Sequence, residues 1–392
     1  MRLTTRGFAA AGAGTGLLVL WWLLGDPELL LTAGFLLLAT GAAVAYTRSS
    51  RAELRLARRI SPVTLHAGDD ARVRLEIHNL GPSTMRRLEI VDEVEGLGRA
   101  KFAVARLGRE RRAEARYQVR CRRRGVYRVG PTLVTASDPL GLSETELASG
   151  PVGRIVVFPR VEGLRGFPVV RGRDSAMDAP RPALGGQGGE EFYTLREYQA
   201  GDDIRRVHWP SSAKTDELLV RQLESPWRPR ALVVLDIRSS AYESSRAFEK
   251  AVSGAASVIT HLIGSGFDAD LWSGDPRPVD ASRYSAAMER LALIQPDDSV
   301  DIAAAAAQMS RRGGGGALVL ITGSPDEDLL RVHRLLGVEH PTTLLLTVAS
   351  TTPQSLADFL RRGVSRISIT PDEDWAEAWM ATMDESWTVA SR

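Results

Sequence analysis

An acidic residue and a histidine lie five positions apart in a strongly polar stretch of the sequence, residues 189–214. Asp203 and His208 could act as an acid/base pair, because a carboxylate and an imidazole can exchange protons near neutral pH when their surroundings shift their pKa. Such a pair also needs a nucleophile or a metal ligand at a suitable spacing, and none accompanies it in this stretch. Acid/base catalysis is therefore the minor interpretation of these residues.

Charged side chains of both signs alternate along the same stretch. They can hold one loop conformation through charge-assisted hydrogen bonds, or form a surface that binds a partner, where tryptophan and arginine are common anchors. We therefore predict a structural network or an interface here, and no enzyme. Its candidate residues are Glu191, Arg196, Glu197, Tyr198, Gly201, Asp202, Asp203, Arg205, His208, Trp209, Ser212 and Lys214.

A second candidate site follows the apolar run 231–235, where Asp236, Arg238 and Ser240 alternate with other residues. The pattern resembles the metal site of von Willebrand A domains, Asp-x-Ser-x-Ser, whose oxygen ligands suit a hard divalent ion such as Mg²⁺. Arg238 replaces the first serine, which removes a ligand and adds a positive charge. A later strand ends at residues 321–324, where such domains usually carry an acid and this chain has none. We therefore predict no cofactor, with Mg²⁺ as a minor alternative, and expect Asp236 to pair with Arg238 or to cap the following helix.

Other catalytic chemistries find no support in the residues. The glycine run 313–316 lacks the Gly-Lys-Ser/Thr of a phosphate-binding loop. The six histidines contain no His-x-x-x-His pair. Cys121 lies in a predicted strand region with no histidine nearby in sequence, so a thiol nucleophile is not expected. As the single cysteine it cannot form an intramolecular disulfide, which suits a reducing compartment.

The second candidate site belongs to a region, from Arg230 onwards, in which strands and helices alternate. The fully apolar run 231–235 is typical of a strand covered on both faces. Further strands are predicted at 267–272, 317–322, 342–348 and 365–369, and helices at 248–262, 281–293, 302–311, 326–336 and 354–361. Such alternation predicts a doubly wound parallel sheet, in which ligands bind at the carboxyl ends of the strands.

Between residues 60 and 159 the hydrophobic period changes to two. Val73, Leu75 and Ile77 alternate with charged residues, and so do the apolar residues between 113 and 119. Turn signals such as Gly130-Pro131 and Asp138-Pro139 separate the runs. Several short, half-buried strands at this spacing predict an immunoglobulin-like sandwich or a small barrel.

The N-terminus carries two charge-free apolar runs, 8–24 and 29–46, joined by Gly25-Asp26-Pro27-Glu28. Each run is close to the length of about 20 residues that a membrane-spanning helix needs. Proline, glycine and two carboxylates end the first helix, so we predict a transmembrane hairpin. A cleaved signal peptide would need a small-residue cleavage site, and residues 23–27 offer a poor one.

Arginines lie at both ends of the predicted hairpin, whereas its turn is acidic. Basic residues that flank membrane helices tend to lie on the cytoplasmic side. We therefore predict that both termini and all soluble parts lie in the bacterial cytoplasm. Residues 48–128 hold 21 basic against 10 acidic residues, with the densest run at Arg122–Arg124. This +11 balance favours either a solvated arginine-rich surface or attraction to anionic inner-leaflet lipid. Nucleic acid is not an expected partner, because acids alternate with the bases and no nucleic-acid motif is present.

The polar stretch also resembles the signature of the bacterial domain-of-unknown-function 58 family. That signature reads roughly Glu-Phe, Leu-Arg-Glu-Tyr, Gly-Asp-Asp, Arg, a hydrophobic residue, His or Asp, Trp and Ser-Ala-Arg/Lys. Pro210 stands where a lysine is usual. The matching positions are Glu191-Phe192, Leu195 to Tyr198, Gly201 to Asp203, Arg205 or Arg206, His208-Trp209 and Ser212 to Lys214. The resemblance implies a partner of the MoxR type among AAA+ ATPases.

The sequence thus predicts a transmembrane hairpin (1–47), a basic β-sandwich-like domain (48–160), a linker with the signature segment (161–229) and a von Willebrand A-like α/β domain (230–392). The predicted function is a membrane-anchored interaction or assembly module in the bacterial cytoplasmic membrane. Two alternatives stay open: an inner-leaflet enzyme acting on envelope precursors through Asp203 and His208, and a sensor that binds anionic lipid through the basic domain.

Overall fold

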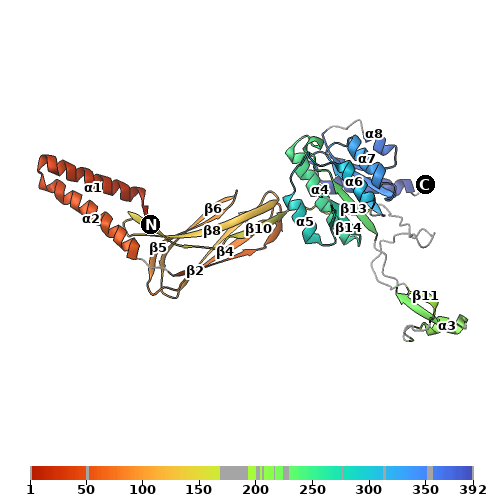
Figure 1. The fold of residues 1–392 in the computed structure, drawn as a ribbon, viewed down its shortest axis with the longest axis horizontal. Helices are drawn as coiled ribbons and strands as arrows, with labels where there is room; N and C mark the ends of the chain where they lie inside the picture. Colours follow the sequence, from red (N-terminus) through yellow and green to blue (C-terminus); the bar gives the residue numbers. More distant parts are fainter. Residues whose placement is uncertain are drawn as a thin grey trace. The chain divides into compact units, whose positions relative to one another are not determined.

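The computed structural model describes residues 2–49, 53–167, 193–199, 204, 207–215, 217–223, 229–275, 277–311, 315–350 and 356–390. The chain divides into two compact units, Met1–Arg160 and Val161–Arg392. The first holds two long helices and a β sandwich, and the second holds the α/β domain together with the signature segment (Figure 1).

Two helices form the N-terminal hairpin, α1 (Thr5–Leu24) and α2 (Pro27–Ser49), which lie side by side (Figure 1). Gly25 ends α1 with a left-handed φ of 75°, and its N–H donates to the carbonyl oxygen of Trp21 at 2.7 Å. This conformation favours glycine because it carries no Cβ. Both helices are long and apolar enough to cross a membrane. The hairpin predicted from the sequence is therefore present as two apolar helices.

The rest of the first unit is a β sandwich. Within the described residues its larger sheet has seven strands: β1 (Arg2–Leu3), β3 (Thr64–His66), β5 (Met85–Val94), β6 (Gly98–Leu107), β8 (Gly125–Ser137), β9 (Ser143–Ser149) and β10 (Gly153–Phe158). The smaller sheet holds β2 (Leu54–Ser61), β4 (Asp70–Asn79) and β7 (Arg112–Arg120). Leu75 and Ile77 of the smaller sheet share a core with Leu88 and Ile90 of the larger one. The two sheets therefore pack face to face, as the alternation of apolar and charged residues predicts.

The hairpin is fixed to one end of the sandwich. β1 precedes α1 and pairs antiparallel with β9. Thr4 donates from its side chain to the carbonyl oxygen of Gly141 at 2.6 Å, and the Thr47 and Ser143 hydroxyls lie 2.8 Å apart. The contacts all fall on residues 141–144, at the turn between β8 and β9 and the first two residues of β9. The sequence alone predicts neither β1 nor this attachment.

Gly7 of α1 lies so close to this turn that a side chain cannot fit. A Cβ at residue 7 would lie 2.0 Å from the carbonyl oxygen of Leu142, whereas one at Gly12 would meet nothing within 4 Å. We expect Gly7→Ala to push α1 off the sandwich, at the cost of about 1–3 kcal/mol that overpacking carries. Hydrogen exchange of the detergent-solubilised chain should then quicken at residues 138–143 and stay unchanged in Gly12→Ala. Equal exchange in the two variants would contradict the attachment.

The second unit contains the predicted parallel sheet. Its strands are β13 (Arg230–Leu235), β14 (Asp268–Trp272), β15 (Val279–Asp280), β16 (Ala317–Thr322), β17 (Thr342–Val348) and β18 (Ser365–Ile369). They lie in the order β15-β14-β13-β16-β17-β18, with only β15 antiparallel among these strands. The helices are α4 (Ser245–Gly264), α5 (Tyr284–Leu293), α6 (Ile302–Ser310), α7 (Glu327–Leu336), α8 (Leu356–Leu360) and α9 (Trp375–Ala390).

The order of these strands reverses between β13 and β16. After β13 the chain enters α4, whereas α6, α7 and α8 share one core with Leu232, Val234 and Leu320 of the sheet. Side chains on a strand alternate between faces, so Val233 and Leu235 point to the opposite side. In doubly wound sheets a reversal of this kind opens the space where ligands bind. The carboxyl ends of β13 and β16 are thus the place to look for a site.

A short arm, residues 161–167, packs on this domain and leads toward the signature segment. The Glu162 carboxylate pairs with Lys250 of α4 at 2.7 Å and accepts the backbone N–H groups of Trp375 and Ala376 at the start of α9. The Phe167 ring lies against His261, Phe267 and Trp379. Neither the arm nor α9 is predicted from the sequence, because their contacts join residues about 90 to 215 positions apart.

Candidate functional site

Asp236 is the first residue after β13 and is fully buried. Its N–H donates to the carbonyl oxygen of Ile321 at 2.9 Å, which ties it to the neighbouring β16. Thr322, the last residue of β16, donates its hydroxyl to Asp236 Oδ2 at 3.0 Å. The strand reversal therefore holds a buried carboxylate and a hydroxyl side by side.

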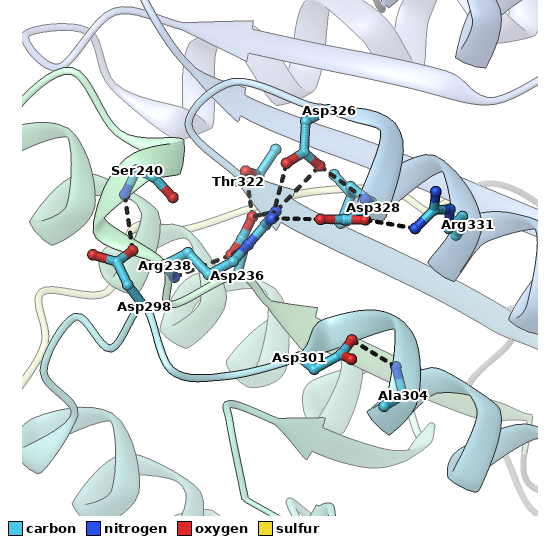
Figure 2. Close-up of polar contacts among 11 residues, drawn as sticks. Asp236, Arg238, Ser240, Asp298, Asp301, Ala304, Thr322, Asp326, Asp328 and Arg331 are labelled. Atoms are coloured by element: carbon cyan, nitrogen blue, oxygen red, sulfur yellow. Dashed lines mark hydrogen bonds and ion pairs between the residues drawn. The ribbon is translucent and has the colours of Figure 1, made fainter.

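The Arg238 guanidinium fills the space in front of that carboxylate (Figure 2). Its Nε and Nη2 contact the two carboxylate oxygens of Asp236 at 3.0 and 2.8 Å. Nη1 and Nη2 also reach the oxygens of Asp326 at 2.8 and 3.2 Å, and Nη1 lies 3.5 Å from Asp328. Of the two alternatives that the sequence left open, the structure shows pairing of Asp236 with Arg238. The cap of α4 is Ser244 instead.

The electrostatics of this group favour the charged forms of Arg238 and Asp326. Burial alone would lower the pKa of Arg238, but hydrogen bonds to Asp236 and Asp326 outweigh it and raise that pKa above its usual range. Burial would likewise raise the pKa of Asp326, but the hydrogen bonds from Arg238 and from the Leu329 N–H bring it below 3.8. The contribution of Asp326 to stability is therefore present above about pH 4 and is lost as the pH falls through the lower folded pKa.

Ser240, the other residue retained from the metal-site pattern, lies outside this group. Its backbone N–H donates to Asp298 Oδ1 at 3.1 Å (Figure 2). The hydroxyl of Ser239 donates to the other oxygen of Asp298. These bonds lower the pKa of Asp298. Ser240 therefore helps to fix the loop after β13 and does not face Asp236.

These residues do not fit a divalent ion. Both oxygens of Asp236 already accept from the Arg238 guanidinium, and the positive charge lies where an ion would be held. Among the described residues, no group of three or more His, Cys, Asp or Glu side chains could hold a metal ion. We therefore derive no chemistry from a metal at this site.

Three functional residues of this site were missed from the sequence: Thr322, Asp326 and Asp328. The comparison at residues 321–324 found no acid, yet the acid comes from Asp326, two positions later. Its side chain also caps α7 by accepting the N–H of Leu329 at 2.9 Å. An N-cap aspartate four positions after the end of a buried strand was the available signal, because it places a carboxylate near the strand ends.

The signature segment forms a hairpin with a short helix, built from β11 (Tyr193–Glu197), α3 (Trp209–Thr215) and β12 (Leu219–Leu223). Ser212 joins the helix to β12, because its hydroxyl accepts the N–H of Leu219 at 2.9 Å and donates to the carbonyl oxygen of His208. His208 Nδ1 lies 2.8 Å from the hydroxyl of Ser211. Ser212 and His208 thus hold the turn.

Three large apolar side chains of this segment are exposed: Ile204 to 62%, Trp209 to 61% and Leu218 to 46%. Glu197 and Lys214 are also exposed, and the Tyr198 N–H donates to the carbonyl oxygen of Leu218. Arg196 lies in β11 opposite Val220. The remaining predicted residues, Glu191, Gly201, Asp202, Asp203 and Arg205, lie outside the described part of the chain, and with them the Asp203–His208 pair.

A comparison with protein-family models now bears on both candidate sites. The model "Protein of unknown function DUF58" matches residues 194–359. The DUF58 match begins in β11 and ends in α8, so it contains the signature hairpin and the Asp236–Arg238 group. It leaves out the helical hairpin and the sandwich.

A relative from Bacillus subtilis (strain 168), named "Uncharacterized protein YeaD", is 25% identical over 295 residues and covers 71% of this chain and 73% of its own length. Among solved structures, the CARDB domain of a Pyrococcus furiosus protein matches 28% of this chain and 90% of its own, with 16% identity and a TM-score of 0.23. The C-terminal domain of wzt matches 27% of this chain and 73% of its own, with 10% identity and a TM-score of 0.22.

Proposed function

We propose that this chain is a membrane-anchored interaction module of the bacterial cytoplasmic membrane. The apolar helices α1 and α2 anchor it, and the arginines at both ends of the hairpin keep the soluble units in the cytoplasm. The sandwich is of the immunoglobulin-like class and the α/β domain of the von Willebrand A-like class. The packing of the two sheets supports the first assignment, and the parallel sheet together with the degenerate Asp-x-Ser-x-Ser pattern supports the second.

The exposed apolar group of Ile204, Trp209 and Leu218 carries this proposal. All three lie within 15 residues of each other, on a two-stranded hairpin with a helix of seven residues. Tryptophan is enriched among the residues that dominate binding energy, because it combines a large apolar surface with few rotatable bonds. We infer that a partner protein covers this group.

A MoxR-type AAA+ ATPase is the partner that we propose. The resemblance of the signature segment to the domain-of-unknown-function 58 family supports this choice, since the DUF58 match covers the same hairpin. The enzyme alternative is weaker, because the side chains of His208 and Ser212 are used in holding the turn. Binding of nucleic acid is not proposed.

Anionic lipid is a weaker alternative as well, because the densest basic run lies far from the end where the helices join the sandwich. The chain leaves α2 at the Leu54 end of β2, and the pairing of β2 with β4 and β7 puts Arg120 at the opposite end. Eight strand residues span about 26 Å. Arg122–Arg124 follow Arg120, so they lie well beyond the screening length of about 8 Å from headgroups at the hairpin end.

Trp209→Ala tests the proposal. We expect the tagged full-length chain, solubilised from its own host in detergent, to recover an AAA+ ATPase, and the variant to recover about tenfold less or none, since loss of a central tryptophan typically costs 2 kcal/mol or more. Leu293→Ala is the matched control, because Leu293 is 58% exposed in α5 of the same unit.

Two results would count against the proposal. The first is recovery of no ATPase by the parent chain. The second is equal recovery by the parent chain, Trp209→Ala and Leu293→Ala, which would move the interface away from the signature hairpin. Circular dichroism of each purified variant establishes that it is folded before recovery is compared.

A further inference from the structure

Three carboxylates surround a single positive charge at the strand reversal, and the hydroxyl of Thr322 bonds to one of them (Figure 2). The Arg238 guanidinium makes five contacts with Asp236, Asp326 and Asp328, between 2.8 and 3.5 Å. A guanidinium has five N–H groups, so none remains for another ligand. Arg238 is only 8% exposed, and Asp236 is fully buried. The cation is therefore built into the site and saturated by it.

The same oxygens would repel one another without that cation. The carboxylates of Asp236 and Asp326 share Nη2, so their oxygens lie on either side of one nitrogen. The hydroxyl of Thr322 adds a neutral oxygen beside Asp236. Carboxylates and hydroxyls are the ligands that hard divalent ions prefer. An uncompensated buried carboxylate is costly, so this arrangement requires either the guanidinium or an ion in its place.

We propose that Arg238 is the built-in cation of this site, and that the chain carries in a side chain the charge that a divalent ion would otherwise supply. The carboxyl edge of the sheet then keeps its shape without metal. Through Asp326 the same guanidinium joins the loop after β13 to the start of α7, so the two loops at this edge are held together.

The proposal predicts a gain of metal binding when the guanidinium is replaced by an oxygen ligand. Arg238→Ser leaves the side-chain oxygens of Asp236, Thr322 and Asp326 around the vacated position and adds a serine hydroxyl to them. We expect the full-length purified variant in detergent to bind one Mn²⁺ at least tenfold more tightly than the parent chain, as measured by electron paramagnetic resonance. Mg²⁺ should compete for the same site. Adding Asp236→Asn to Arg238→Ser should abolish the binding.

Two further variants control this experiment. Arg331→Ser removes a nearby arginine that contacts Asp328 at 3.1 Å but leaves Arg238 in place, so it should bind no additional Mn²⁺. Arg238→Lys keeps a cation and should also stay free of Mn²⁺. Thermal unfolding of Arg238→Ser should be raised by Mg²⁺ and lowered by a chelator, whereas the parent chain should show neither effect.

Each other outcome overturns the proposal. A folded Arg238→Ser that binds no more Mn²⁺ than the parent chain would show that the carboxylates do not form a cation site. A second result is that the parent chain itself binds Mn²⁺ and loses that binding in Asp236→Asn. That result would show that Arg238 does not supply the cation of this site. A third result is that Arg238→Ser and Arg238→Ala are both unfolded, whether or not Mg²⁺ is added. An ion then cannot replace the guanidinium. None of these measurements involves a partner, so their failure leaves the proposed function untouched.

Discussion

Replacing Arg58 by methionine is expected to lower the free energy of unfolding of the sandwich by about 3–5 kcal/mol, the usual cost of removing one partner of a buried ion pair. The Arg58 side chain is 3% exposed and pairs with Asp92, which is fully buried. Its Nη2 also donates to Thr132 and its Nη1 to the carbonyl oxygen of Val129. Methionine would leave the Asp92 carboxylate with only the hydroxyls of Thr132 and Tyr117.

Hydrogen exchange of the full-length chain measures this loss strand by strand, since exchange of the most protected amides reports the free energy of unfolding of their unit. The largest acceleration should fall in β2, β4 and β7, around Arg58 and Tyr117. Arg99→Ala is the matched control, because its ion pair with Glu93 is 62% and 52% exposed and should change stability by less than about 0.5 kcal/mol. Similar exchange in the two variants would show that the Arg58 network does not stabilise the sandwich.

Replacing Glu162 by alanine should release the arm 161–167 from the α/β domain, with a loss of about 3 kcal/mol. The carboxylate is 6% exposed, and its partner Lys250 is 13% exposed, so the remaining ammonium would stay largely buried without its main counter-charge. Two N–H groups at the start of α9 would lose their acceptor, at the end of a helix where a negative charge is favourable. Faster exchange in α9 and in residues 161–167 is the expected result.

A double-mutant cycle separates the ion pair from simple loss of packing. Lys250→Met should recover part of the stability in the Glu162→Ala background, because replacing both partners of a buried pair is often close to neutral. Arg246→Ala, which breaks the exposed pair with Asp372 on the same side of the domain, is the control and should have little effect. Additive effects of Glu162→Ala and Lys250→Met would contradict the coupling.

Elements with a strong local pattern were predictable from the sequence. The apolar runs 8–24 and 29–46 form the helices α1 and α2. Gly25 ends α1 with a left-handed backbone conformation. Alternation at Val73, Leu75 and Ile77 gave β4, and the fully apolar run 231–235 gave β13 with both faces covered. In each case the period of the hydrophobic residues is set by the element itself.

Features that depend on distant partners were not predictable. β1 has two residues, and it exists because Arg2 and Leu3 pair with Glu144 and Ser143. Glu162 becomes a helix-capping residue only where the fold brings it to Trp375. No local pattern encodes such contacts, because the chain between the partners is more than 130 residues long in each case.

In the candidate site, too, the local contact could be predicted from the sequence and the long-range contact could not. Pairing of Asp236 with Arg238 could be expected, since the two residues are separated by one position and have opposite charges. The contact of Arg238 with Asp326 could not be expected, because it depends on β13 and β16 lying side by side in the sheet. The acid was sought at residues 321–324, whereas Asp326 supplies the carboxylate from the N-cap of the next helix.

Site-specific photo-crosslinking at residue 209 in living host cells tests the central claim most directly. A photoreactive phenylalanine analogue in place of Trp209 should give one strong adduct that contains an AAA+ ATPase, because the side chain at this position is 61% exposed and is proposed to lie under the partner. The same analogue at Leu293, which is 58% exposed, should give none. Adducts at neither position, or the same adducts at both, would contradict an interface on the signature hairpin.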